Sequence, residues 1–527
     1  MPAPLPLARA GLAVALAVVS SLAAASARAS TTQENQAKYT HLRERLTTKF
    51  VKVGAAPGES VPAEVRHEVQ SFIKFADATL NHGWYIGILA TEYHLRTHLS
   101  VYPGADNGDA AAASKTLDEL YYALFALERM DNVADAAFPA PCTTSPSTNG
   151  FFLRDDVPAG FHANFPPMTT TQSDFIDPTL TNKEMSQDQV YHLLLGLALV
   201  KHLVPASVMV KGKSPRAWAA EQARRIGQHF AKDNWVIKNP ACGDREVNRG
   251  GKAIGYSSGT CLAFKFISDG TYVPTTDTLW DGIWNTLKSP TNPAYNDADN
   301  LHMAMAIAAV GNGWGATTAA ELITLAGKED WPLYSLAHRV LHEGNAAGFC
   351  TGGATLNTRA RTMLDELPSN GDPAAPQPGA PAPHGFTTNH RFTRPKSQAY
   401  VGSAGTEGQH FSGTDYMLLH NLYAIATPAT WVQGPSVAPC TGFVPAGSST
   451  DGGADSDGGP SGGDGGSGGG SSGSSGAGGG AADPGAGGDD PAPSGCACDL
   501  SAAGASSAWG ALALPALIGL LRIRRRR

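Results

Sequence analysis

The sequence has little charge and no basic stripe in its main body. Charged residues make up 16% of the chain, and the formal net charge is −7. Because nucleic acids are bound through clustered lysine and arginine, we expect no nucleic-acid partner. No repeat of fixed length is visible, which argues against a regular solenoid. Strand patterns are few and short.

The motifs of common metal and nucleotide sites are also missing from the sequence. There is no Walker phosphate loop, and the main body contains no Cys-x-x-Cys. The pairs His94/His98 and His338/His342 have the i, i+4 spacing that places two imidazoles on one helix face, but neither carries the Glu of a His-Glu-x-x-His site. We therefore expect no metal and no other cofactor.

The first 29 residues have the pattern of a signal peptide. Arg9 precedes an apolar run from Gly11 to about Ala25, and residues 27–29 supply a small-x-small cleavage site. The run is shorter than the ~20 apolar residues that a membrane-spanning helix needs. We therefore expect cleavage and export, with the mature chain beginning near Ser30.

The other end of the chain combines a linker with cysteines, apolar residues and arginines in the order typical of a membrane anchor. Gly, Ser and Asp dominate residues 446–495, which predicts a disordered stalk. Residues 496–527 then contain Cys496, Cys498, an apolar segment that predicts a hydrophobic transmembrane helix, and a terminal arginine cluster. Arginines in this position stay on the cytoplasmic side during export.

This order of features resembles the myxobacterial MYXO-CTERM sorting signal. The resemblance implies recognition by a sorting protease within the membrane, cleavage near the cysteines, lipid attachment, and display at the cell surface or outer membrane. Cys-Ala-Cys stands where Cys-Gly-Cys is common in that family, so whether Cys496 or Cys498 carries the lipid is open. A plain C-terminal membrane anchor that is never processed is the alternative.

The remaining residues, 40–445, have the pattern of a helical domain. Thr116 with Glu119 and Ser186 with Gln189 have capping-box spacing, which predicts two helix starts, and Gly83 is expected to separate two helices. Periodic apolar residues predict helices over Pro62–Leu80, Trp84–His98, Thr116–Asp131, Val190–Val204, Ser214–Phe230, Thr275–Leu287, Ala298–Val310, Thr317–Ala326, Leu333–His342 and Asp415–Ala426.

Helices that are apolar nearly all round alternate with amphipathic ones. The segment Val190–Val204 is of the first kind and Ser214–Phe230 of the second. This alternation predicts an all-α domain in which buried helices lie inside outer ones. In layout it resembles the (α/α) toroids of glycoside hydrolases and polysaccharide lyases, although no family motif matches residue by residue. An irregular helical bundle, or two helical domains divided near 367–385, is the alternative.

Two adjacent carboxylates in the long connection 138–183 are the first candidate catalytic residues. Asp155 and Asp156 follow two aromatic residues and Arg154. Glycoside hydrolysis uses two carboxylates that flank the scissile bond. We therefore consider this pair as base and positioning group, with Arg154 as a substrate-binding residue. The alternative is a turn before Pro158 in which Arg154 is the ion partner of the pair.

The predicted helix start at residue 186 is the second candidate site. Asp188 lies in its first turn, where the positive helix end also stabilises a carboxylate without any catalysis. Around it are amide and ring side chains of the kind that hold sugars, namely Gln187, Gln189, Tyr191 and His192.

Glu92 is the third candidate, because a carboxylate in an otherwise apolar helix needs a partner or a raised pKa. It is either catalytic, beside Tyr93 as a substrate-binding residue, or paired with an arginine such as Arg129. The last helix supplies Asp415 as a possible cap.

Two further residues are candidates for binding substrate, each with a structural alternative. Tyr416 shares one face of the last helix with His420, and His302 lies in a helical pattern among apolar residues. Core packing explains both equally simply.

Two hypotheses for function follow, and the first is slightly favoured. One is an enzyme that hydrolyses or eliminates across glycosidic bonds of an extracellular polysaccharide, with Asp188 as acid, Asp155 or Asp156 as base, and Glu92 in support. The other is a surface protein that binds glycan or protein without catalysis, or serves the envelope structurally. Salt-bridged acids would favour the second hypothesis.

Overall fold

All of the residues that the structure describes belong to one compact unit of the chain, Met1–Asp455. The computed structural model describes residues 32–76, 78–99, 111–137, 147–177, 183–232, 237, 257–270, 303–304, 306–307, 332–342, 360–365, 367 and 408–427. Of these residues 63% are helical and 7% lie in strands, so the prediction of a mainly α-helical fold is confirmed.

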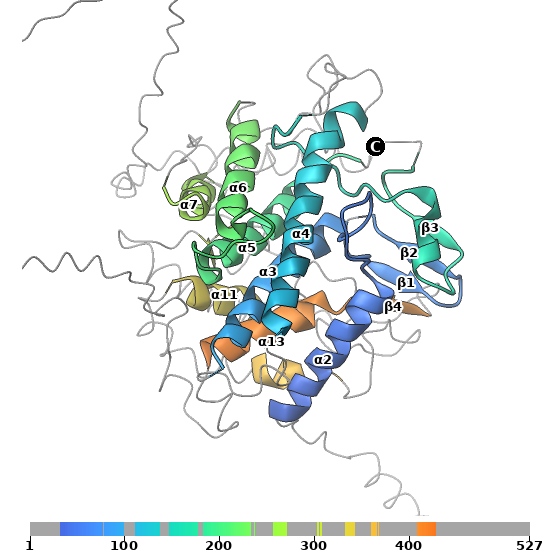
Figure 1. Ribbon diagram of the computed structural model, residues 1–527, viewed down its shortest axis with the longest axis horizontal. Helices are drawn as coiled ribbons and strands as arrows, with labels where there is room; N and C mark the ends of the chain where they lie inside the picture. The colour runs from blue at the N-terminus through green and yellow to red at the C-terminus, as the bar shows by residue number, and fades with distance from the viewer. Residues whose placement is uncertain are drawn as a thin grey trace, which may run out of the picture. The chain divides into compact units, whose positions relative to one another are not determined.

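Short strands are interspersed among the helices in chain order (Figure 1). The elements are α2 (Thr32–Lys49), β1 (Val65–His67), β2 (Phe72–Lys74), α3 (Ala78–Thr97), α4 (Ala112–Ala134), η1 (Asp135–Ala137), η2 (Ala159–Asn164), β3 (Thr170–Gln172), α5 (Gln187–Leu203), α6 (Pro215–Lys232), α7 (Ser257–Ile267), α11 (Leu333–Leu341), β4 (Gln409–Phe411) and α13 (Thr414–Ala426).

Helices α3 and α13 lie side by side and run in the same direction. Near their N-terminal ends the Thr414 hydroxyl donates to the Asn81 side chain over 3.0 Å. Further along both helices, the Asn421 amide donates to the Thr91 hydroxyl over 3.1 Å. Because residue numbers rise together in the two contacts, the two helices are parallel.

Helix α5 packs on another face of α3, also in parallel. Gly83 lies against the backbone of His192, and Gly87 lies against the side chain of Leu199. A Cβ atom at Gly83 would stand 2.4 Å from the His192 carbonyl oxygen, so only glycine permits this approach. Gly83 was expected to separate two helices. That prediction is wrong, because the residue lies inside α3.

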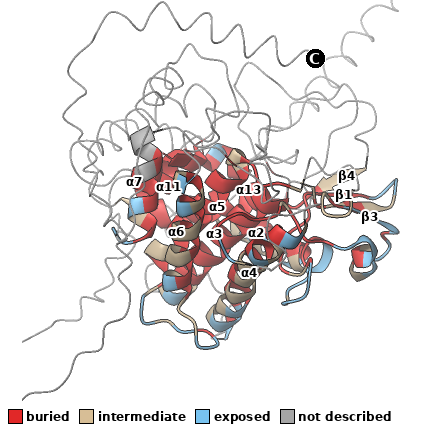
Figure 2. Ribbon diagram, turned by 90° about the horizontal axis from the view of Figure 1, so that it is seen from above, coloured by how far each residue is buried: buried red, intermediate tan, exposed pale blue. Residues whose placement is uncertain are grey.

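Helix α4 packs on α3, and helix α6 packs on α5. Helix α4 is antiparallel to α3, since Thr116 bonds to Glu92 whereas the Ala123 carbonyl bonds to His82. Helix α6 lies next to α4. Figure 2 shows α3, α5 and α13 buried almost throughout, whereas α4 and α6 also carry exposed residues. The predicted alternation of buried and amphipathic helices is seen in α3 to α6.

The described strands form one four-stranded sheet of order β3-β2-β1-β4. Strand β1 is antiparallel to β2 and β4, and β2 is parallel to β3. The sheet therefore brings residues 409–411, which directly precede α13, beside residues 65–67. The predicted helix Pro62–Leu80 is wrong, because most of that segment is the β1–β2 hairpin and α3 begins only at Ala78.

The two capping-box predictions had different outcomes. Ser186 and Gln189 form the expected box at the start of α5. Helix α4 instead begins at Ala112, so Thr116 lies within it and its hydroxyl bonds to Glu92 and to the Ala112 carbonyl. The predicted helices over 214–230, 333–342 and 415–426 are present with similar bounds, whereas those over 275–287 and 317–326 lie outside the described residues.

Candidate functional site

The N-terminal ends of α3 and α5 are joined by contacts of the connecting loop. The Thr79 amide at the start of α3 donates to the Arg154 carbonyl over 3.2 Å. The Arg154 amide in turn donates to the Lys183 carbonyl, and Leu153 pairs with Glu184 just before α5. The connection around residues 151–157 therefore lies beside the starts of α3 and α5.

Asp188 lies in the first turn of α5, as predicted. It is half-buried, and its carboxylate accepts hydrogen bonds from the Ser186 hydroxyl and the Gln189 amide. Gln189 is buried, and its side-chain oxygen accepts a hydrogen bond from the backbone amide of Ser186 over 3.0 Å, so this residue caps the helix. Gln187 is half-buried beside it. Asp188 is therefore the one of the four candidate catalytic acids that is not buried.

His192 and Trp84 connect the start of α5 to α3. The His192 imidazole bonds to the Asp188 carbonyl over 2.7 Å, and its ring lies 5.1 Å from that of Trp84 between centroids. The Tyr191 side chain points toward α7, because its hydroxyl bonds to Thr260 of that helix over 2.8 Å. His192 is thus placed near Asp188, whereas the hydroxyl of Tyr191 lies between helices.

Asp415 lies in the first turn of α13, and its environment was not foreseen. Its side chain is only 4% exposed, one oxygen accepts the Tyr416 amide over 2.8 Å, and Oδ2 has no partner among the described residues. Burial raises the pKa of this carboxyl well above its usual value. The residue does not cap the helix, because Gly413 occupies the N-cap position. Burial therefore favours the neutral form of the Asp415 carboxyl over the ionised form.

Among the described residues, three more buried polar atoms without a hydrogen-bond partner lie on the first two turns of α3. They are Thr79 Oγ1, His82 Nδ1 and Trp84 Nε1, on residues that are 0%, 0% and 2% exposed. Each such atom costs about 1–3 kcal/mol of folding free energy when it stays unpaired. No sequence pattern singles them out, since Thr and Trp in an apolar helix usually pack in the core.

Asp155 and Asp156 are both buried in polar contacts of the connecting loop. Asp155 accepts bonds from the Ser173 hydroxyl and from the amides of Val157 and Asp174. Burial, opposed by these bonds, raises the pKa of Asp155 to about 7. These contacts tie the loop to the segment that follows β3.

Asp156 forms an ion pair with Arg129 of α4. The Arg129 guanidinium contacts both carboxylate oxygens, with Nε 2.5 Å from Oδ2, and the Gly58 amide donates to Oδ1. Arg154 is not the ion partner of this pair, because its side chain bonds to the Glu184 carbonyl and lies 3.7 Å from Asp174. The expected Arg154 pairing is therefore wrong.

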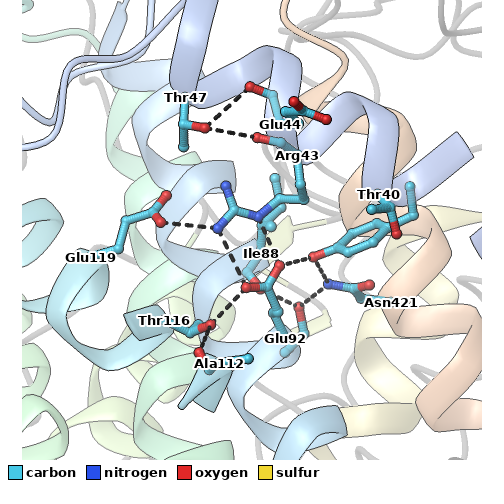
Figure 3. A network of polar contacts seen from close by, with 12 residues as sticks. Thr40, Arg43, Glu44, Thr47, Ile88, Glu92, Ala112, Thr116, Glu119 and Asn421 are labelled. Atoms are coloured by element: carbon cyan, nitrogen blue, oxygen red, sulfur yellow. Dashed lines mark hydrogen bonds and ion pairs between the residues drawn. The ribbon is translucent and has the colours of Figure 1, made fainter. Parts of the chain in front are cut away.

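Glu92 is the centre of a buried polar network between α2, α3, α4 and α13 (Figure 3). Its carboxylate pairs with Arg43 at 2.7 Å and accepts bonds from the hydroxyls of Tyr39 and Thr116. Arg43 also contacts Glu119 at 3.1 Å. The expectation of an arginine partner is confirmed, but the partner is Arg43 of α2 rather than Arg129.

The charge of this network keeps Glu92 ionised. Burial would raise its pKa, but the nearby charges of Arg43 and Arg96 outweigh burial and lower the pKa to about 2. A carboxylate held in this way is a strong structural ion partner and a poor proton donor near neutral pH.

The remaining candidates are packed or lie outside the described residues. Tyr93 is buried in α3, and the Tyr416 hydroxyl lies 3.4–3.5 Å from acceptors on Asn35 and Leu364. His302, Cys496 and Cys498 are not among the described residues. Within the part of the chain that the structure describes, no group of three or more His, Cys, Asp or Glu side chains has the arrangement of a metal site. No helix there is long and apolar enough to cross a membrane.

Comparisons with known proteins identify no relative. No protein-family model matches the chain, and no match was found among curated proteins or solved structures. The function must therefore be inferred from the geometry.

Proposed function

We propose that this protein is an exported, surface-anchored enzyme that cleaves glycosidic bonds with Asp188 and Asp415. The supporting observation is that two acids in different surroundings stand at corresponding positions, in the first turns of the parallel helices α5 and α13. Asp415 is buried and has a raised pKa, whereas Asp188 is half-buried and hydrogen-bonded. Glycoside hydrolysis uses two carboxyl groups, one as general acid and one as general base, and a buried carboxyl with a raised pKa suits the acid.

In this proposal the helical domain is an (α/α) toroid. The parallel inner helices α3 and α5 are each followed by an outer helix, α4 and α6, and α13 joins α3 from the end of the described chain. An inner ring of parallel helices brings all their N-terminal ends to one face, where the positive helix ends and the connecting loops form a site.

The chemistry assigned to the two acids is a hydrolysis. Asp415 donates its proton to the glycosidic oxygen as the bond from that oxygen to the anomeric carbon breaks. Asp188 accepts a proton from the water whose oxygen bonds to the anomeric carbon. One water is consumed, and the cycle closes when Asp188 releases its proton to solvent and Asp415 takes one up.

Asp155, Asp156 and Glu92 have no catalytic role in this proposal. Each is buried and bound by two or more groups of its own surroundings, so their contacts support a structural function. The same contacts are the observation that favours the second candidate, a displayed protein that binds glycan or protein without catalysis.

The proposal is tested by release of reducing sugar from a panel of bacterial and plant polysaccharides. The full-length protein, purified in detergent, is compared with Asp188→Asn and with Asp118→Asn. Asp118 lies on the exposed face of α4, where it pairs with Lys211, and is the matched control. We expect release that Asp188→Asn reduces by at least about 100-fold, the size of a general acid–base effect, and that the control retains. Equal release by both variants would exclude Asp188 from the reaction, and no release by the unaltered protein would favour the binding protein.

A further inference from the structure

A cluster of histidines lies at the C-terminal ends of α3, α5 and α11. Four of its members form the two i, i+4 pairs that the sequence shows, and the fifth is in the last turn of α5. They are His94, His98, His202, His338 and His342. The proposed cleavage uses none of them, so the cluster calls for an explanation of its own.

Ring contacts hold each i, i+4 pair together. The rings of His94 and His98 stack with their centroids 4.1 Å apart, and the rings of His338 and His342 lie 5.0 Å apart. Among the described residues, these side chains do not have the arrangement of a metal site. Each pair therefore places two imidazoles, which repel each other when both are charged, within contact distance.

His202 of α5 connects the two pairs. The ring of Phe266 in α7 lies 6.4 Å from the ring of His202 and 5.0 Å from that of His342. A charge on His202 lowers the pKa of His94 and also that of His342. Because such an effect requires proximity, His202 lies close to both pairs, and the histidines form one electrostatic cluster.

The surroundings favour the neutral form of the imidazoles. His94 and His338 are 4% and 2% exposed. Burial, followed by the charges of neighbouring histidines, lowers the pKa of His94 and of His342 to about 3, and burial lowers that of His338 to about 4. The C-terminal end of a helix alone would favour a charged histidine, so burial and like charge outweigh the helix end here.

The packed elements bring further charged or titratable groups to the same ends of the helices. They are Arg96 of α3, Lys115 of α4, Lys201 of α5, Arg216 of α6, Asp269 after α7, Arg339 of α11 and Tyr423 of α13. Asp269 pairs with Lys201 at 2.9 Å and with Arg216 at 3.4 Å. Because this carboxylate already has two cations, it offers little compensation to a histidine that becomes charged.

Proton uptake by this cluster opposes the packing of the three helix ends. A histidine with a lowered pKa in the closed form binds a proton more tightly once its surroundings open. The closed form is therefore most stable above the usual histidine pKa of 6.5, and it loses stability as pH falls from 6.5 toward the lowered values.

We propose that the histidine cluster is an acid-sensitive switch, which holds the C-terminal ends of α3, α5 and α11 together while its imidazoles are neutral and releases them when acid charges the imidazoles. This inference goes beyond the proposed function and does not depend on it, since Asp188 and Asp415 lie in the first turns of their helices. In the proposed location at the cell surface, the domain would respond to the external pH.

Hydrogen exchange followed by mass spectrometry tests the release in the unaltered protein. Full-length protein in detergent is exchanged between about pH 7 and 5, the ordinary titration range of histidine, and rates are corrected for the pH dependence of exchange in unstructured peptides. We expect peptides from 93–98, 198–203 and 333–342 to open more as pH falls, by up to about tenfold per pH unit for each buried histidine released. Peptides from 120–127 of α4, which contain no histidine, should change less.

The double variant His94→Gln/His342→Gln tests the imidazoles themselves. Glutamine retains hydrogen-bonding capacity but does not titrate. We expect the opening constant of the same helix ends to rise up to about 100-fold less per pH unit than in wild type, because two proton-binding groups are gone. The matched control is His41→Gln, an exposed histidine of α2, which should keep the wild-type dependence.

A second variant covers the case in which the double variant does not fold. His98→Gln, at a half-buried position, removes the like charge stacked on His94 and should weaken the acid-induced opening of 93–98. Equal changes in the three helix ends and in α4 of the unaltered protein would overturn the switch. An unchanged pH dependence in either folded variant would also overturn it.

Discussion

At the scale of single residues, the most consequential contact is the ion pair between Glu92 and Arg43. Both side chains are largely buried, and Arg43 also contacts Glu119. A buried charge that loses its partner is costly, because neither water nor another counter-ion replaces the lost contact. The network therefore fixes α2 against α3 and α4.

Replacing Glu92 by Gln should strongly destabilise the protein. We expect the free energy of unfolding to fall by about 3–5 kcal/mol, as when one partner of a buried pair is removed, measured by urea denaturation. The control is Glu44→Gln, an exposed residue of α2, which should change stability by less than about 0.5 kcal/mol. Equal effects of the two changes would show that the network contributes no special stability.

The same residue makes a prediction about pH. The folded-state pKa of Glu92 is about 2, below its usual 4.5, because Arg43 and Arg96 outweigh the effect of burial. A lowered carboxylate pKa stabilises the folded state above pH 4.5, and this stabilisation is lost as pH falls from 4.5 to 2. Unfolding experiments across this range should show a steeper loss of stability in the wild type than in Glu92→Gln. Parallel curves would contradict the assignment.

At the scale of elements, the close contact of α3 with α5 depends on glycine. Gly83 and Gly196 face each other, and a Cβ atom on Gly196 would stand 2.2 Å from the Gly83 carbonyl oxygen. No side chain of another element can move aside to relieve this overlap, since the atoms involved belong to the backbone. The two helices would have to separate.

Gly83→Ala should therefore destabilise the fold by about 1–3 kcal/mol or more, as overpacking does. Gly160→Ala in η2 is the control, because a Cβ there meets nothing within 4 Å. Thermal unfolding of the two variants gives the comparison. A melting temperature for Gly83→Ala at or above that of the control would mean that α3 and α5 are less closely packed than described.

Sequence patterns predicted a helix correctly where the local spacing of its residues was sufficient to define it. The capping box of Ser186 and Gln189 and the amphipathic pattern of α6 depend on local spacing, and both were confirmed. The β1–β2 hairpin was missed because Val65, Phe72 and Ile73 also fit helical spacing, and its partner β4 lies far away in the sequence. Helix α2 was missed because the residues it buries include Asn35, Lys38 and Arg45, whose partners lie in other elements.

The residues of the candidate site were also predictable only where a local sequence pattern marks them. Asp188 could be found because a helix start has a local signature. Asp415 was recognised only as a possible cap, since its burial depends on elements distant in the chain. The ion partners of Glu92 and Asp156 were likewise misassigned. Arg43 and Arg129 reach these carboxylates through tertiary packing, which the sequence positions of the residues do not reveal.

At the scale of the whole molecule, we propose a helical enzyme domain carried to the cell surface. The predicted signal peptide, stalk and sorting signal lie outside the described residues, so this part of the proposal rests on sequence. It explains why an enzyme for extracellular polysaccharide would carry Cys496 and Cys498 ahead of an apolar segment and an arginine cluster.

Surface anchoring makes its own prediction. Replacing both Cys496 and Cys498 by Ala should abolish labelling of the protein by a fatty-acid probe and reduce its share in the outer-membrane fraction. The two single variants show which sulfur is modified, and Cys350→Ala is a control outside the sorting signal. Undiminished labelling of the double variant would contradict lipid attachment at this motif.

The central claim is that Asp188 and Asp415 form the acid–base pair of a glycoside hydrolase. The most direct measurement is kcat for reducing-sugar release from a polysaccharide that the protein cleaves, by wild type, Asp188→Asn and Asp415→Asn, each confirmed as folded by circular dichroism. The account predicts that both variants lose at least about 100-fold in kcat, whereas Asp118→Asn retains the wild-type value. Wild-type rates in folded Asp188→Asn or Asp415→Asn protein would contradict it.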